Sequence, residues 1–129
     1  MRTNLRAGVV VLLAACIAAA GGCTPLRTKS VQLSRALARM DFAYENLFRA
    51  FIAKRVTEEV KNKGKALYDE GFAAHLPARE ELVAAREAGD TGLKAPGRLD
   101  RVNQAIDTVN DRARRIEALN PSTAAPAPK

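Results

Sequence analysis

The chain has 129 residues, which is enough for one domain of ordinary size and too few for two. It has no tryptophan and only 5% aromatic residues, and much of its apolar content is alanine, so a deep aromatic core is excluded and helices packed side by side are favoured. The formal net charge of +7 predicts attraction to anionic surfaces.

Residues 1–22 have the parts of a secretory signal. Residues 1–6 are polar and carry two arginines with no acid, and residues 7–20 form an apolar run. A transmembrane helix needs about 20 apolar residues, so the run has the shorter length of a signal-peptide core. Two glycines then precede Cys23 and would let a peptidase reach the backbone. We therefore predict that residues 1–22 are a cleaved signal and that the chain is exported.

Two stretches resemble the lipobox of bacterial lipoproteins, in which a leucine, a small residue and a glycine or alanine precede the cysteine that receives the lipid. Residues 13–16, Leu-Ala-Ala-Cys, fit this pattern letter for letter, whereas residues 20–23, Ala-Gly-Gly-Cys, have alanine in place of leucine. We favour Cys23 as the lipidation site, because cleavage before Cys16 would leave a very short apolar core and strand apolar residues on the mature chain. Two competing interpretations of the N-terminus are an uncleaved signal anchor and an ordinary cleaved signal with accidental cysteines.

The resemblance to lipoproteins also predicts where the chain resides. Lipidation of Cys23 uses the only thiol of the mature chain, so no disulfide is expected. In enterobacterial lipoproteins an aspartate after the cysteine retains the protein in the inner membrane, and here that residue is Thr24. The resemblance thus implies a lipid anchor in the outer membrane, with the domain on its periplasmic face. Export makes a nucleic-acid partner unexpected and leaves lipid headgroups, lipopolysaccharide and peptidoglycan as anionic partners.

Residues 23–29 are polar enough for a tether, and from Ser30 the spacing of apolar residues predicts one long helix. The stripe follows a heptad spacing and then slips by one position, as a straight helix does. Its members are Leu33, Leu37, Met40, Tyr44, Leu47 and Phe51, followed by Ile52, Val56, Val60 and Leu67. Ser30 suits the N-cap of this helix, and Glu59 with Lys63 has the spacing of a helical ion pair. Asp111 with Arg115 has the same spacing in the last predicted helix. Glycines at 64 and 71 are expected to bend or fray the second half of the long helix.

Two further helices are expected after this one. Pro77 fits the first turn of a new helix over residues 77–88, and residues 89–97 have the composition of a turn and loop. The last helix has the clearest pattern of the chain, and Asn120-Pro121 ends it. Its stripe consists of Leu99, Val102, Ile106, Val109, Ala113 and Ile116.

The predicted fold is therefore all-α, either an antiparallel helical hairpin or a small three-helix bundle with coiled-coil-like packing over residues 30–120. Residues 121–129 are rich in proline and alanine and are expected to form a disordered tail. The apolar stripes are narrow, so we expect self-association or a protein partner to stabilise the domain.

The titratable residues give no pattern of catalysis. His75 is the only histidine and is expected at a helix end or on the surface, with no nucleophile or acid at recognisable spacing. The paired carboxylates at 58–59 and 80–81 are expected to be solvated charge, because neighbouring helical side chains point about 100° apart. We predict no catalytic residue, no metal site, no cofactor and no enzymatic activity.

The aromatic and basic residues are the candidates for binding. All aromatics lie between Phe42 and Phe72, and Tyr44, Phe48 and Phe51 share one broad helix face. We expect this face to pack in the core, the alternative being an exposed groove for a partner helix. The basic residues of the first helix are expected to form a solvated face, with contact to an anionic surface as the alternative. They are Arg35, Arg39, Lys54, Arg55, Lys61, Lys63 and Lys65.

The C-terminus adds one resemblance. The major lipoprotein of enterobacteria is a small helical lipoprotein joined to peptidoglycan through a C-terminal lysine, and this chain ends at Lys129. It lacks the tyrosine-arginine pair that precedes the lysine in that family and departs from its single unbroken helix. The resemblance implies a contact with peptidoglycan.

The function predicted from the sequence is that of a lipid-anchored envelope protein with a structural or adaptor role through protein binding. The alternative is an accessory subunit or assembly factor of a larger envelope machine, such as a secretion or lysis system.

Overall fold

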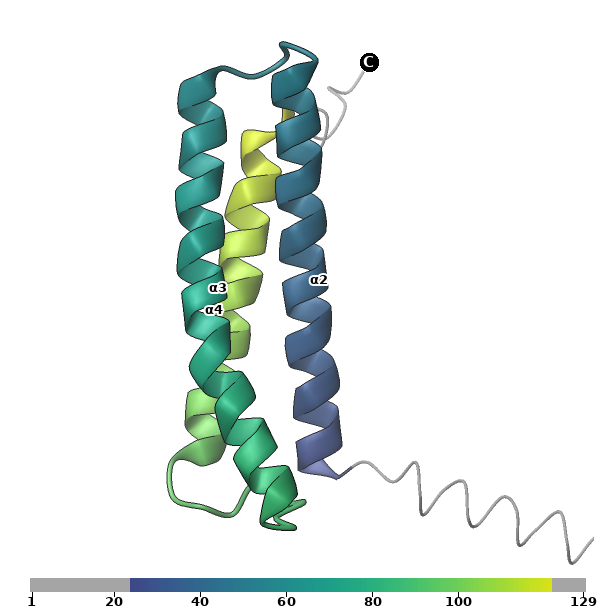
Figure 1. Ribbon diagram of the computed structural model, residues 1–129, viewed down its shortest axis with the longest axis vertical. Helices are drawn as coiled ribbons and strands as arrows, with labels where there is room; N and C mark the ends of the chain where they lie inside the picture. Colours follow the sequence, from purple (N-terminus) through teal and green to yellow (C-terminus); the bar gives the residue numbers. More distant parts are fainter. Residues whose placement is uncertain (1–23, 122–129) are drawn as a thin grey trace, which may run out of the picture.

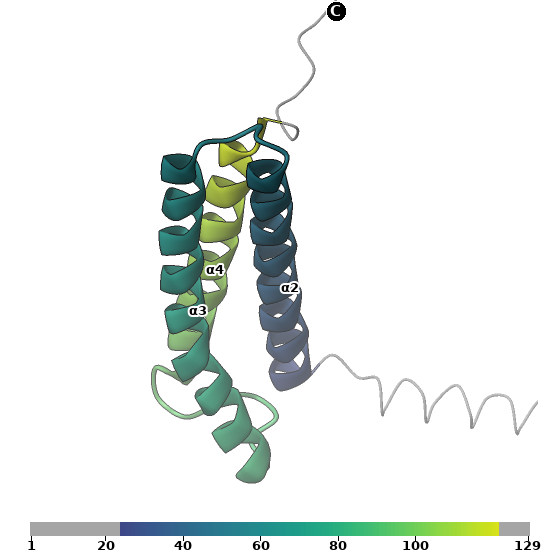
Figure 2. The ribbon, with the colours of Figure 1, turned by 45° about the horizontal axis from the view of Figure 1, so that its top comes forward.

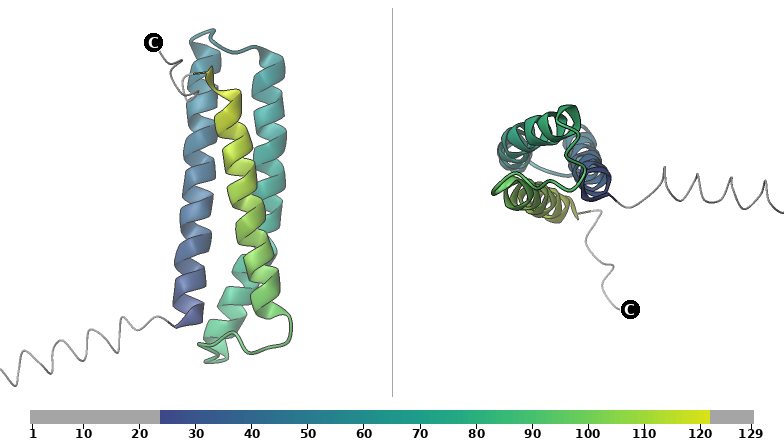
Figure 3. Two further views of the ribbon diagram at one scale, coloured as in Figure 1. Left: turned by 180° about the vertical axis from the view of Figure 1, so that it is seen from behind. Right: turned by 90° about the horizontal axis from the view of Figure 1, so that it is seen from below.

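The computed structural model describes residues 24–121, which form three helices around one core (Figure 1). Helix α2 spans Pro25–Ile52, α3 spans Glu58–Glu87 and α4 spans Arg98–Leu119. The chain runs up, down and up again, so α3 is antiparallel to both other helices (Figure 3). Each helix packs against the other two, which makes the domain a three-helix bundle and excludes the simple hairpin. Within residues 24–121 there is no strand.

Several predictions concern parts of the chain outside the described residues. These are the signal peptide, the two cysteines Cys16 and Cys23, the C-terminal tail and Lys129.

Helix α2 begins six residues earlier than the sequence predicts, when the two N-cap positions are compared. Its N-cap is Thr24, whose Oγ1 accepts a hydrogen bond from the backbone N–H of Arg27 at 3.3 Å, and Pro25 occupies the first turn, where a missing N–H costs nothing. Ser30, the predicted cap, lies inside the helix and donates its hydroxyl to the carbonyl of Leu26. From Pro25 onward the predicted tether is therefore helical.

The prediction of one long helix is wrong beyond Ile52, because the chain turns over residues 53–57. Lys54 has a φ of 59°, in the left-handed region that ends helices. A new cap follows at once, since the Oγ1 of Thr57 accepts from the N–H of Val60 at 3.3 Å. The apolar stripe continues across this turn because Val56 is half-buried against the core, so periodicity alone does not reveal the break.

The predicted short helix from Pro77 is instead the second half of α3. Pro77 lies inside this helix, where its ring removes one backbone hydrogen bond. Figures 1 and 2 show α3 bending in its lower part, after a straight upper part beside α2. Buried Ala78, Leu82 and Ala85 follow the proline and pack in the lower half of the core. This packing explains why the helix continues past a residue that usually ends one.

Small residues let the helices approach closely. Gly64 and Gly71 are buried, and a Cβ atom on them would lie 2.1 Å from Cδ2 of Leu47 and 2.3 Å from Sδ of Met40. The helix is continuous through both glycines, so they do not fray it as the sequence suggests. They face α2, and their missing side chains leave the room that the two large side chains occupy.

The core is aliphatic. Leu33, Met40 and Leu47 of α2 are buried, and so are five of the six predicted stripe residues of α4, from Val102 to Ile116. No aromatic residue between 24 and 121 is fully buried, so the expectation that the aromatic face packs in the core is wrong for Phe48 and holds only in part for Tyr44 and Phe51. In the described part of the chain, no helix combines the length and the apolar character that a membrane span requires.

Candidate functional site

His75 is buried, not at a helix end or on the surface as predicted. Only 4% of it is exposed, and it lies in the middle of α3. Its Nδ1 is 3.3 Å from the carbonyl oxygen of Phe72, which favours the tautomer with the proton on Nδ1. Among residues 24–121 no three histidine or carboxylate side chains gather closely enough to hold a metal ion.

In the carboxylate pair at 80–81, Glu80 is exposed as predicted, whereas Glu81 is half-buried and paired. Glu81 accepts from Arg98 at 2.8 Å and from Arg101 at 2.7 Å, so it joins α3 to the start of α4. Hydrogen bonds from Arg98 and then Arg101 lower the pKa of Glu81. The predicted pairs Glu59–Lys63, at 3.1 Å, and Asp111–Arg115, at 3.0 Å, are present.

A row of aromatic rings follows the boundary between α2 and α3. Tyr44 stacks on Tyr68 with ring centroids 5.0 Å apart, Tyr68 stacks on Phe72 at 6.2 Å, and Phe72 meets His75 at 5.1 Å. The hydroxyl of Tyr68 donates to Asp41 at 2.8 Å. Burial, and then this hydrogen bond, raise the pKa of Tyr68 to about 12. The Tyr44–Tyr68 stack and the Tyr68–Asp41 hydrogen bond thus link α2 to α3.

Below this row the two helices flank an open groove of about 350 Å³, the α2–α3 groove. It lies near the end of the bundle where α2 begins, and the loop after α3 closes that end because the N–H of Leu26 donates to the carbonyl of Thr91 at 3.0 Å. The lining from α2 is Leu26, Ser30, Leu33, Ser34 and Leu37, and from α3 it is His75, Arg79, Leu82, Val83 and Arg86.

At the opposite end of the bundle, apolar side chains are exposed on the last turns of α2. Ile52 is 66% exposed and Phe48 is 42% exposed. Phe51 lies beside Phe48, with ring centroids 6.2 Å apart, and carries the ammonium of Lys61 over its ring at 4.6 Å. We call Phe48, Phe51 and Ile52 the distal patch.

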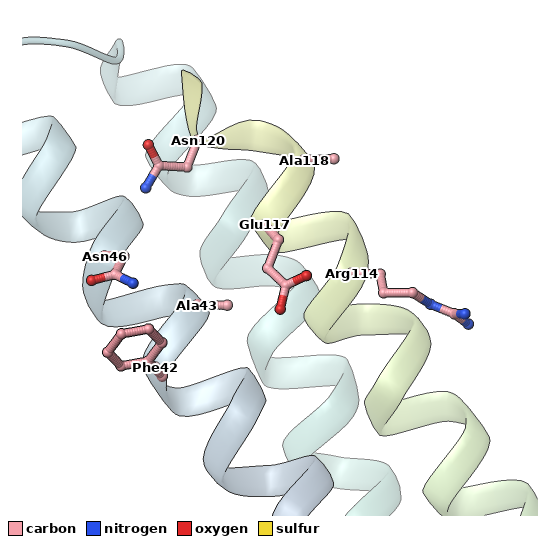
Figure 4. A pocket seen from close by; sticks show the side chains of 7 residues that line it. All are labelled: Phe42, Ala43, Asn46, Arg114, Glu117, Ala118 and Asn120. Atoms are coloured by element: carbon pink, nitrogen blue, oxygen red, sulfur yellow. The ribbon is translucent and has the colours of Figure 1, made fainter. Parts of the chain in front are cut away.

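A second pocket, of about 400 Å³, lies between α2 and α4 near the same end (Figure 4). Phe42, which is 65% exposed, and Asn46 flank it from α2, and Asn120 flanks it from the end of α4. Glu117 also lines it and accepts hydrogen bonds from Nε and Nη2 of Arg39, at 2.7 and 2.8 Å. The Glu117 carboxylate therefore links α4 to α2.

The basic residues of α2 and α3 are divided between two roles. Arg39 and Lys65 hold carboxylates of α4 and α3, and Lys63 pairs with Glu59. Arg79 and Arg86, which were not among the basic candidates predicted from the sequence, lie on the rim of the α2–α3 groove. The sequence feature that could have indicated Arg79 and Arg86 is their spacing of seven residues, which places both on one helix face with Phe72 and Val83.

Comparison of the chain with protein-family models, with curated proteins and with solved structures finds no significant match in any of the three.

Proposed function

We propose that the chain is a lipid-anchored protein of the bacterial envelope, attached through Cys23 to the periplasmic face of the outer membrane. Its role is structural: it presents a helical bundle to a protein partner as an adaptor. The lipobox-like segment before Cys23 supports the anchor, and the exposed apolar end of the bundle supports the partner.

The observation that carries the adaptor role is the distal patch. Monomeric proteins keep large apolar side chains scattered, and a contiguous exposed group marks an interaction surface. Here Phe48, Phe51 and Ile52 share the last two turns of α2, where Phe48 and Ile52 are exposed and Phe51 is half-buried beside Phe48. Aromatic side chains of this kind supply much of the binding energy of protein interfaces.

The position of the patch suits a lipid-anchored adaptor. Only Thr24 separates Cys23 from the first helical residue, Pro25, so an anchor on Cys23 would hold the lower end of α2 at the bilayer. Helix α2 has 28 residues and is therefore about 42 Å long. The distal patch would then face away from the membrane, where a partner protein can reach it.

The test is a photo-crosslinking experiment in cells that express the full chain. A photoreactive amino acid at Phe48 should give a discrete adduct with one protein, whereas the same amino acid at Asp107, on the exposed side of α4, should not. The double variant Phe48→Ser, Ile52→Ser should abolish co-purification of that protein.

Val31→Ser is the matched control, because Val31 is also apolar and exposed on α2 but lies at its other end. The control should retain the partner. Equal loss of the partner in both variants, or no adduct at Phe48, would refute the adaptor role.

A further inference from the structure

The α2–α3 groove combines an apolar floor with unneutralised positive charge. Leu33 and Leu82 form part of the buried core at its base, and Leu37 lines its upper part. On the rim, Arg79 and Arg86 are exposed, and within residues 24–121 no ion pair joins either guanidinium to a carboxylate.

The groove arginines differ in this respect from two arginines nearby. On the neighbouring face of the bundle, Arg98 and Arg101 share the carboxylate of Glu81. Arg79 and Arg86 are two helical turns apart, about 10 Å along the axis, so both present donors to the same side of α3. The hydroxyl of Ser34, on the opposite rim, adds a neutral hydrogen-bonding group.

The dimensions of the groove restrict its occupant. A helix with its side chains is about 10–12 Å across, which a volume of about 350 Å³ between two contacting helices does not admit. Part of a single extended hydrocarbon chain can lie in such a space, and the unpaired guanidinium groups are suited to a phosphate, which accepts paired hydrogen bonds from arginine.

We propose that the α2–α3 groove binds an anionic phospholipid, with one acyl chain along Leu33, Leu37 and Leu82 and the phosphate on Arg79 and Arg86. The inference rests on the proposed lipid anchor, which would bring this end of the bundle to the bilayer. It adds a second, non-covalent lipid contact, on a face different from the distal patch.

The test uses the full chain in phosphatidylcholine vesicles that contain a trace of phosphatidylglycerol with a photoactivatable acyl chain. After irradiation, mass spectrometry locates the label. We expect it on the segments around Leu37 and Val83, and we expect at least about tenfold less label at these positions with photoactivatable phosphatidylcholine. Both lipids carry a phosphate, but the choline ammonium of phosphatidylcholine would repel Arg79 and Arg86, and a tenfold difference corresponds to about 1.4 kcal/mol.

The double variant Arg79→Ala, Arg86→Ala should lose the groove label, whereas Arg35→Ala, Arg55→Ala removes the same charge elsewhere and should keep it. Ser34→Leu, which adds apolar bulk to the groove without removing charge, should also lose it. Circular dichroism shows whether each variant is folded.

Equal labelling by the two lipids, or label confined to the outer face around Leu76, would overturn the proposal. So would a protein adduct from a photoreactive amino acid at Ser34 in cells. These results are separate from the proposed function, since the anchor is read from the mass of the N-terminal peptide and the adaptor role from adducts at Phe48.

Discussion

Glycine at two core positions sets the distance between α2 and α3. At Gly64 and Gly71 the partner side chains, Leu47 and Met40, are fully buried and occupy the space that a Cβ atom would need. Leucine and methionine thus pack against the backbone of α3 itself. Glycine costs a helix about 1 kcal/mol relative to alanine, but at these positions the alanine Cβ would clash with a buried side chain.

Gly64→Ala should therefore destabilise the protein although alanine is the better helix former. The new Cβ would lie 2.1 Å from Cδ2 of Leu47, and overpacking of this kind costs about 1–3 kcal/mol. Asn62→Ala, on the exposed side of the same helix, should leave the melting temperature unchanged or slightly higher. Thermal unfolding of the two variants measures this difference. If Gly64→Ala were as stable as the parent, the close approach would not be a requirement of the fold.

Tyr68 should titrate unusually late. Its pKa is raised from 10 to about 12, so its neutral form stabilises the fold below pH 10, and this contribution is lost as the pH rises through about 12. Ultraviolet absorbance of tyrosinate should show a component near pH 12 that is absent in Tyr68→Phe. Absence of this component from the unaltered protein would contradict the burial of Tyr68 and its hydrogen bond to Asp41.

Individual side chains also show where sequence reasoning ends. The sequence places both His75 and Glu81 at the surface, because a lone histidine close to a proline is typical of a helix end and neighbouring glutamates on a helix point apart and are typical of solvated charge. His75 is buried because α3 does not end at Pro77, and Glu81 is paired because α4 brings two arginines to it. Both errors come from long-range packing, which local spacing does not encode.

The helices are delimited by caps that the sequence contains but that periodicity conceals. Thr24 and Thr57 each accept a hydrogen bond from a backbone N–H three residues later, and Glu58 and Glu59 complement the dipole at the start of α3. The sequence Thr57-Glu58-Glu59, a capping residue followed by two acids, is typical of a helix start and could have indicated the break. The continuous apolar stripe outweighed it in the prediction, whereas α4, with one unbroken stripe and a proline stop, was predicted correctly.

Thr57→Ala should lower the free energy of unfolding by about 1 kcal/mol, the usual contribution of an N-cap. Thr108→Ala is the control, because the Thr108 hydroxyl donates to the carbonyl of Gln104 within α4 and caps no helix end. This control should be neutral or slightly stabilising in denaturant unfolding. Equal effects of the two substitutions would show that Thr57 does not cap α3.

Acid should loosen the contacts between helices. The pKa values of Glu81, Asp90 and Glu117 are lowered, mainly by hydrogen bonds from Arg98, from the backbone of Lys94 and from Arg39. A lowered pKa contributes stability above the unfolded value, near pH 4, and this stability is lost as the pH falls through the folded value. The melting temperature should therefore decrease between about pH 5 and pH 2, and Glu81→Gln should reduce the slope. A flat profile would mean that these pairs contribute little.

The bundle as a whole depends on α4, which packs against both other helices. Ile106 is buried in the lower half of the core, so Ile106→Asp should cost more than about 3 kcal/mol by burying an unpaired charge. Gln104→Asp adds the same charge on the exposed side of α4 and should have little effect. Unchanged melting of the Ile106 variant would show that α4 does not pack as described.

The sequence predicted the all-α class and the core stripes of α2 and α4, because heptad spacing reports directly on buried helix faces. It did not predict the surfaces. Phe42, Ile52 and Val83 belong to the same apolar class as core residues, and only the orientation of each helix in the bundle decides that they are exposed. The α2–α3 groove likewise requires the bend of α3 and the short loop beside Leu26, which are tertiary features.

Lipid attachment at Cys23 is the central claim, because it places the groove at the membrane and the distal patch away from it. The measurement is metabolic labelling with a palmitate analogue, together with the mass of the mature N-terminal peptide, in the full chain and in Cys23→Ala and Cys16→Ala. Two or more acyl chains are needed for stable attachment, since a single chain binds only weakly. Label should disappear in Cys23→Ala, with loss of membrane retention, and persist in Cys16→Ala. Label that persists in Cys23→Ala and disappears in Cys16→Ala would move the anchor to Cys16, and absence of label from the unaltered chain would contradict the lipoprotein assignment.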